Sequence, residues 1–207
     1  LPPVAGGWTW TPVSTPLGHP DAPLQELQLR MRETEGRLAE ELCTAGYITV
    51  VDGPLNFVRS RDVPVVGFVK TQHDPQLPRE QHRLVPGLTA GQRTSLFSKR
   101  ADVYSCYLRL TDRGQHASPW AGIVRLELPA STGLRAAREA ADRAAATLPR
   151  YAGIPHVDPR APQNLQPVGS LERHLRHLLG DHGLATRAVR EAVVVLDRAG
   201  TPAVPAP

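Results

Sequence analysis

The sequence predicts a mixed α/β fold, with a central sheet and helices on its faces. Four short segments rich in β-branched and aromatic residues predict strands, at 47–51, 63–70, 103–110 and 120–128. Four segments with helical apolar spacing or many alanines predict helices, at 21–43, 134–148, 170–179 and 184–198. The alternation of the two kinds of segment excludes an all-α or all-β fold.

The first helix has recognisable signals at both ends. Asp21 can cap it, Pro23 is tolerated in its first turn, and Gly46 ends it. The strand at 47–51 is continuously apolar, as in a strand buried on both faces, and it runs directly into the turn sequence Asp52-Gly53-Pro54. The preceding segment, 1–20, is rich in proline and glycine and predicts irregular structure.

The later elements follow from local pattern. The turn-rich stretch 111–119 separates two strands and predicts a hairpin, whereas the polar stretch 72–100 predicts no regular element. We therefore expect one domain over 21–198 and a flexible tail over 199–207.

Composition limits the possible classes of function. The chain has 207 residues, 41% of them apolar, which is enough to bury a core. It contains no apolar run of about 20 residues, so we expect no membrane span. The two cysteines, Cys43 and Cys106, make no disulfide framework and favour a reduced, cytoplasmic setting. A net charge of +4 is compatible with nucleic-acid binding, although arginine-rich basic composition is also typical of GC-rich genes.

Glu35 is the most informative acid of the first helix. Its helical position falls inside the apolar stripe formed by Leu24, Leu27, Met31, Leu38 and Leu42. A carboxylate on a buried helix face is costly unless it is paired or binds a metal. Two interpretations are therefore open for Glu35, an ion pair with an arginine and a functional role.

Asp52 follows the first strand directly, where groups at strand ends line ligand sites in α/β sheets. An ordinary turn aspartate is the alternative. Because the helix should pack on this strand, Glu35 and Asp52 should lie close together. Two neighbouring carboxylates repel each other unless a cation lies between them, and oxygen ligands suit Mg²⁺ or Mn²⁺.

Other polar residues give weaker signals. Lys70 ends the second strand and can contact a phosphate or solvent. Glu172 lies at the start of a helix, which it can stabilise electrostatically, and Glu127 is expected on the solvent face of its strand. His174 and His177 have a spacing that zinc can use, but a solvent-facing stripe explains them more simply. The chain contains no GxGxxG, P-loop or GxSxG motif.

The run from Glu35 through Tyr47-Ile48-Thr49-Val50-Val51-Asp52-Gly53-Pro54-Leu55 resembles the helix-Glu, strand-Asp-Gly-Ser-Leu signature of the NurA nucleases. Val69-Lys70 is also similar to the family. The stretch 164–172 is similar in length to the family's Tyr-Pro-x-Pro-Leu-x-x-Ala-His stretch and keeps its second proline, but has Asn164 in place of Tyr and Glu172 in place of His.

The resemblance implies an RNase H-like mixed sheet and two-metal hydrolysis of DNA during end processing in double-strand-break repair. Glu35 and Asp52 would be metal ligands, Glu172 would replace the family's histidine, and Mn²⁺ or Mg²⁺ would be the cofactor. Lys70, Arg59, Arg61 and Asn164 would contact DNA. The expected partners are a HerA-like hexameric ATPase and a second copy of the chain.

The family's first aspartate and the strands that carry it have no counterpart before the first helix, so the resemblance implies a chain that lacks its first strands. The alternative is a non-catalytic nucleic-acid-binding or assembly subunit on a degenerate nuclease fold. An unrelated α/β domain in which Glu35 is merely ion-paired is the third possibility.

Overall fold

The structure is a computed structural model. It describes residues 21–58, 62–71, 75–114, 117–154, 161–178, 180–181, 183–184, 186–191 and 194. The segments expected to be irregular or flexible, 1–20 and 199–207, lie outside the described residues. The chain divides into two compact units, Leu1–Pro149 and Arg150–Pro207, which we describe separately.

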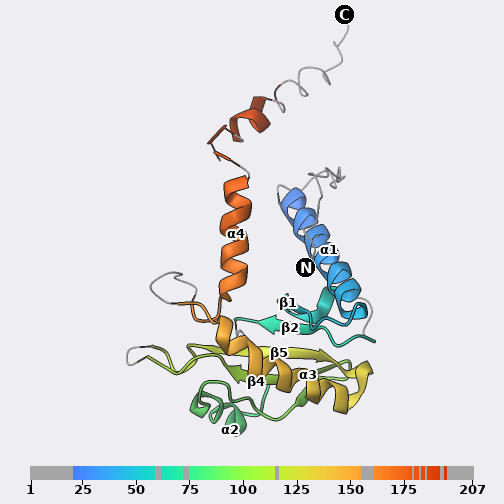
Figure 1. Cartoon of the computed structure of the whole chain (residues 1–207), viewed down its shortest axis with the longest axis vertical. Coiled ribbons are helices and arrows are strands. Elements are labelled where there is room, and N and C mark those ends of the chain that lie inside the picture. The colour runs from blue at the N-terminus through green and yellow to red at the C-terminus, as the bar shows by residue number, and fades with distance from the viewer. Residues whose placement is uncertain are drawn as a thin grey trace, which may run out of the picture. The chain divides into compact units, whose positions relative to one another are not determined.

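The first unit is built on a five-stranded mixed sheet (Figure 1). Its strands are β1 (Val50–Asp52), β2 (Val66–Val69), β3 (Phe97–Arg100), β4 (Val103–Arg109) and β5 (Ile123–Pro129). Their order in the sheet is β1-β2-β5-β4-β3. β1 and β2 are parallel, and the other neighbours are antiparallel. The predicted mixed α/β sheet flanked by helices is therefore confirmed.

Two helices pack on this sheet (Figure 1). The first, α1 (Ala22–Thr44), contacts β1 and a short 3-10 turn, η1 (Leu55–Phe57). The second, α3 (Gly133–Thr147), packs against β2, β4 and β5 and buries a face of alanines: Ala137, Ala140, Ala141, Ala144 and Ala145. Both helices were predicted from the sequence, as was the β4–β5 hairpin, which pairs from Val103–Pro129 to Arg109–Ile123.

The face through which α1 packs differs from the prediction. Leu24, Leu27, Met31 and Leu38 are exposed, with Leu27 60% exposed. The buried residues are Gly36, Ala39 and Cys43. A Cβ atom on Gly36 would lie 2.3 Å from the carbonyl oxygen of Phe57, so only glycine permits this close approach. Small side chains therefore set the packing face of α1, and its leucine stripe does not.

Two strand predictions also need correction. The first strand is shorter than predicted: β1 begins at Val50, and the preceding Tyr47 and Ile48 are exposed. The stretch 72–100 contains regular structure that its polar pattern did not indicate: α2 (Arg79–His82), the 3-10 turn η2 (Val85–Gly87) and β3. β3 is stabilised by pairing with β4, which lies later in the chain, so local pattern alone did not reveal it.

A buried arginine joins distant loops of the first unit. Arg109 at the end of β4 is 1% exposed and donates hydrogen bonds to the carbonyl oxygens of Ala121, Pro86 and Pro119, at 2.8, 2.9 and 3.0 Å. Burial lowers the pKa of this guanidinium. The three bonds connect η2 to the turn that precedes β5.

The second unit contains α4 (Gln166–Leu178), which begins before the predicted start near Ser170. The Gln166 side chain donates to the carbonyl oxygen of Ala152 at 2.9 Å, and Ala152 also pairs with Leu165. The described residues between 183 and 194 are helical, in agreement with the prediction for that segment. Within the described part of the chain, no helix has both the length and the apolar character needed to cross a membrane.

Candidate functional site

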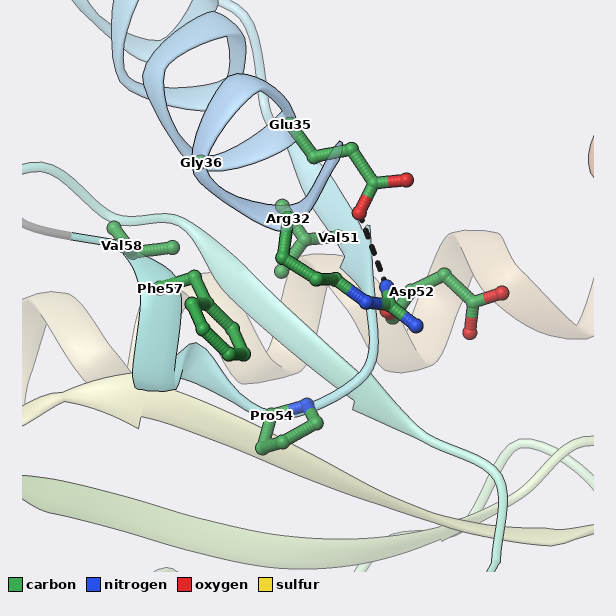
Figure 2. A pocket seen from close by; sticks show the side chains of 8 residues that line it. All are labelled: Arg32, Glu35, Gly36, Val51, Asp52, Pro54, Phe57 and Val58. Atoms are coloured by element: carbon green, nitrogen blue, oxygen red, sulfur yellow. Dashed lines mark hydrogen bonds and ion pairs between the residues drawn. The ribbon is translucent and has the colours of Figure 1, made fainter. Parts of the chain in front are cut away.

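Glu35 and Asp52 line one hollow in the first unit (Figure 2). Residues of α1, β1 and the turn after β1 form its walls, namely Arg32, Glu35, Gly36, Val51, Asp52, Pro54, Phe57 and Val58. The close packing of α1 on η1 through Gly36 brings the two acidic residues to the same place. The expected proximity of the helix to the end of this strand is confirmed.

The parallel pairing of β1 and β2 sets the surroundings of Asp52. Asp52 is the last residue of β1 and lies opposite Phe68 of β2. Gly53 then turns the chain with a φ of +120° and donates its N–H to the carbonyl oxygen of Phe68 at 2.9 Å. Lys70 directly follows β2, and its Nζ lies 2.7 Å from Oδ2 of Asp52. The two strand ends therefore bring a carboxylate and an ammonium together.

Glu35 was predicted to lie on a buried helix face, but its side chain is 46% exposed. The reason is the packing of α1 through its small residues, which turns the leucine stripe and Glu35 away from the core. Arg32, one turn earlier, donates from Nη1 to Oε2 of Glu35 at 3.0 Å. The same nitrogen donates to the main-chain carbonyl of Asp52. Figure 2 shows Arg32 between the Glu35 side chain and the end of β1.

The charges of the site balance in this arrangement. Among the described residues, Arg32 pairs with Glu35 and Lys70 pairs with Asp52. The Asp52 side chain is 42% exposed, so water also reaches it. Ion pairs as exposed as these contribute little to stability, on the order of 0–1 kcal/mol each. The groups can therefore exchange partners with an incoming cation or anion at low cost.

The carboxylate oxygens of Glu35 and Asp52 are chemically suited to a hard cation. Carboxylate oxygens are the ligands that Mg²⁺ and Mn²⁺ favour, and both Glu35 and Asp52 face solvent. Among the described residues there is no group of three or more His, Cys, Asp or Glu side chains that could hold a metal ion. The acidic residues that line the hollow are Glu35 and Asp52.

The remaining predicted site residues lie elsewhere in the chain. Asn164 and Glu172 belong to the second unit, where Asn164 is 1% exposed and Glu172 is half-buried in the first half of α4. His174 and His177 are exposed on α4. Arg59 and Arg61 lie outside the described residues. Lys70 is the only predicted DNA-contacting residue that the structure describes in the first unit, and it pairs with Asp52.

One polar residue near the site was misplaced by sequence reasoning. Glu127 of β5 was expected on a solvent face but is 6% exposed. Its Oε2 accepts the N–H of Leu55 at 3.1 Å, and its Oε1 accepts a hydrogen bond from Nη2 of Arg125 at 2.8 Å. The turn after β1 covers this part of the sheet. The paired Arg125 two residues earlier was the signal that a buried ion pair was possible.

No protein-family model and no curated protein matches this chain. The functional conclusion therefore depends on the site and on the sequence resemblance.

Proposed function

We propose that the protein is a divalent-metal-dependent DNA nuclease of the NurA type, with an RNase H-like fold. One observation carries the proposal: Glu35 from α1 and Asp52 from the end of β1 line the same hollow. This is the juxtaposition that the sequence resemblance implies. The mixed five-stranded sheet flanked by helices is compatible with it.

In this proposal Glu35 and Asp52 hold Mn²⁺ or Mg²⁺. The bound metal would supply activation of water and stabilisation of the leaving oxygen. Lys70 and Arg32 are paired with the two carboxylates. Both would contact phosphate oxygens of DNA once metal binding releases them. The two cationic side chains would thus neutralise the carboxylates when no metal is bound, and would contact the anionic DNA when metal is bound.

The remaining parts of the proposal rest on the resemblance. Arg59 and Arg61 would extend the contact with the DNA backbone, and Glu172 would take the place of the family's histidine. A HerA-like hexameric ATPase would deliver the DNA, and two copies of the chain would form the working enzyme.

A second candidate function is a non-catalytic nucleic-acid-binding or assembly subunit. The two ion pairs favour it, because Arg32 and Lys70 occupy both carboxylates and the described residues supply no third acidic ligand. In this case the cations serve DNA phosphates and the carboxylates only orient the cations.

Incubation of the protein with linear single- and double-stranded DNA distinguishes the two candidates. We expect degradation that requires Mn²⁺, stops with chelator, and is lost in Asp52→Asn. The matched control is Asp142→Asn. This variant removes an exposed carboxylate of α3 that pairs with Arg93 and does not line the hollow. DNA binding without degradation, unchanged by Asp52→Asn, would favour the binding subunit.

A further inference from the structure

We propose that Glu127 is a positioning residue for Asp52. Glu127 does not line the hollow; it fixes the turn Asp52-Gly53-Pro54-Leu55 from beneath, and so sets where the Asp52 carboxylate lies. The role of Asp52 as a metal ligand rests on the proposed function, whereas the placement of the turn by Glu127 does not.

The turn is held at three main-chain groups. The Asp52 carbonyl accepts from Arg32, the Gly53 N–H donates to Phe68, and the Leu55 N–H donates to Glu127. Leu55 is fully buried, so its N–H has no water to replace a lost acceptor. Glu127 lies 72 residues after Leu55 in the chain. Of these three partners, Glu127 is the one that holds the Leu55 end of the turn.

Gly67 makes this contact possible. In the sheet, Gly67 of β2 lies between Val51 of β1 and Glu127 of β5. A Cβ on Gly67 would lie 3.0 Å from the Gly53 carbonyl oxygen and 3.2 Å from Cβ of Glu127. The absence of a side chain at Gly67 therefore lets the turn lie across β2 and reach the Glu127 carboxylate.

The carboxylate of Glu127 needs Arg125 as its counter-charge. The pair is 2.8 Å apart, and both side chains are largely buried, at 12% and 8% exposed. Removing one partner would leave an unpaired buried charge, which is strongly destabilising. Replacing both partners by residues of similar volume avoids that cost, and this allows the hydrogen bond to be tested apart from the charge.

The test therefore compares two double variants that differ at one position. Arg125→Met with Glu127→Gln keeps a side-chain oxygen that can accept the Leu55 N–H. Arg125→Met with Glu127→Met removes that acceptor. Three readouts apply to each protein and to the unmodified chain: thermal unfolding, hydrogen exchange of the Leu55 amide by NMR, and the position of the carboxyl ¹³C resonance of Asp52 at one fixed pH. Mn²⁺ affinity is a fourth.

We expect the glutamine variant to keep slow exchange of the Leu55 amide and an unshifted Asp52 carboxyl resonance. The methionine variant should exchange the Leu55 amide rapidly and shift the Asp52 carboxyl resonance. Its Mn²⁺ dissociation constant should rise about tenfold or more, as is usual when a residue supporting a metal ligand is removed. Rescue by glutamine is an effect that a purely structural loss of the buried ion pair would not produce.

Identical Leu55 amide exchange and identical Asp52 carboxyl resonances in the two double variants would overturn the inference. Failure of every protein to bind Mn²⁺ would contradict the proposed function alone, because the NMR readouts still report whether Glu127 places the turn.

Discussion

Lys70 Nζ lies 2.7 Å from Oδ2 of Asp52, across the ends of two adjacent parallel strands. This pair depends on strand topology, because parallel β1 and β2 end at the same edge of the sheet. A single cation there has two roles in our account: it neutralises Asp52 and is then available to a phosphate group. Removing it should therefore change cation and DNA binding in opposite directions.

The variant Lys70→Met tests this directly. Loss of the ammonium should strengthen Mn²⁺ binding, because Asp52 no longer has a competing cation, and weaken DNA binding. The slope of log K against log salt concentration should fall by about one, corresponding to one lost phosphate contact. Arg135→Met, which removes a 94% exposed cation on α3, is the control and should leave Mn²⁺ affinity unchanged. If Lys70→Met and Arg135→Met changed Mn²⁺ affinity and DNA affinity equally, Lys70 would have no specific role.

Gly36→Ala tests the close approach of α1 to η1. The new methyl group would meet the Phe57 carbonyl oxygen at 2.3 Å, so α1 must shift away from the end of β1. We expect a loss of about 1–3 kcal/mol in the free energy of unfolding, despite the better helix propensity of alanine. Gly87→Ala is the matched control, because no atom lies within 4 Å of the new methyl group. Urea unfolding of both variants measures the difference.

Stability should fall in alkaline solution because of Cys106. Burial raises the pKa of this thiol from 9.0 to about 12. The folded state thus keeps a proton that the unfolded state has lost, so stability is fully present below pH 9 and declines as the pH rises to 12. The slope is about 1.4 kcal/mol per pH unit, with a total of about 4 kcal/mol. Burial also raises the pKa of Tyr107, which adds to the decline at higher pH.

Cys106→Ala removes the titrating thiol and should flatten this decline. Urea unfolding at a series of pH values from 8 to 11 provides the measurement. If the free energy of unfolding of Cys106→Ala instead fell with pH as steeply as that of the unmodified protein, the thiol would titrate alike in the folded and unfolded states.

Arg109→Met tests the buried arginine that joins η2 to the turn before β5. Three carbonyl oxygens lose their donor, and the long apolar side chain keeps most of the volume. We expect a loss of about 2–4 kcal/mol, since each buried acceptor left unsatisfied costs about 1 kcal/mol or more. Arg135→Met, on the surface of α3, should change stability by less than about 0.5 kcal/mol. Equal stability of both variants would contradict this role for Arg109.

The sequence predicted the existence of elements better than their packing. Helix α1 was evident from Asp21, Pro23 and Gly46, but its buried face was not, because an apolar stripe indicated the leucines. The true face depends on how closely Gly36 approaches Phe57, which is a property of two segments in contact. A helical pattern alone does not contain that information.

The candidate site shows the same division. Asp52 at the end of a strand and Glu35 on the adjoining helix were predicted to be neighbours, and they line one hollow. An ion pair with an arginine was one of the two interpretations of Glu35, and Arg32 is that arginine. The counter-charge of Asp52 was not assigned, because the Lys70 contact requires knowledge that β1 and β2 are parallel neighbours. Glu127 was misplaced because alternation along β5 does not reveal that the turn after β1 covers it.

The central claim is that Glu35 and Asp52 together bind a divalent cation, and a Mn²⁺ titration followed by electron paramagnetic resonance of the free ion tests it most directly. We predict binding by the unmodified protein, at least tenfold weaker binding by Glu35→Gln and by Asp52→Asn, and unchanged binding by Glu41→Gln, which alters an exposed carboxylate on the same helix. The same Mn²⁺ affinity in all four proteins, or no binding by the unmodified protein, would contradict the claim.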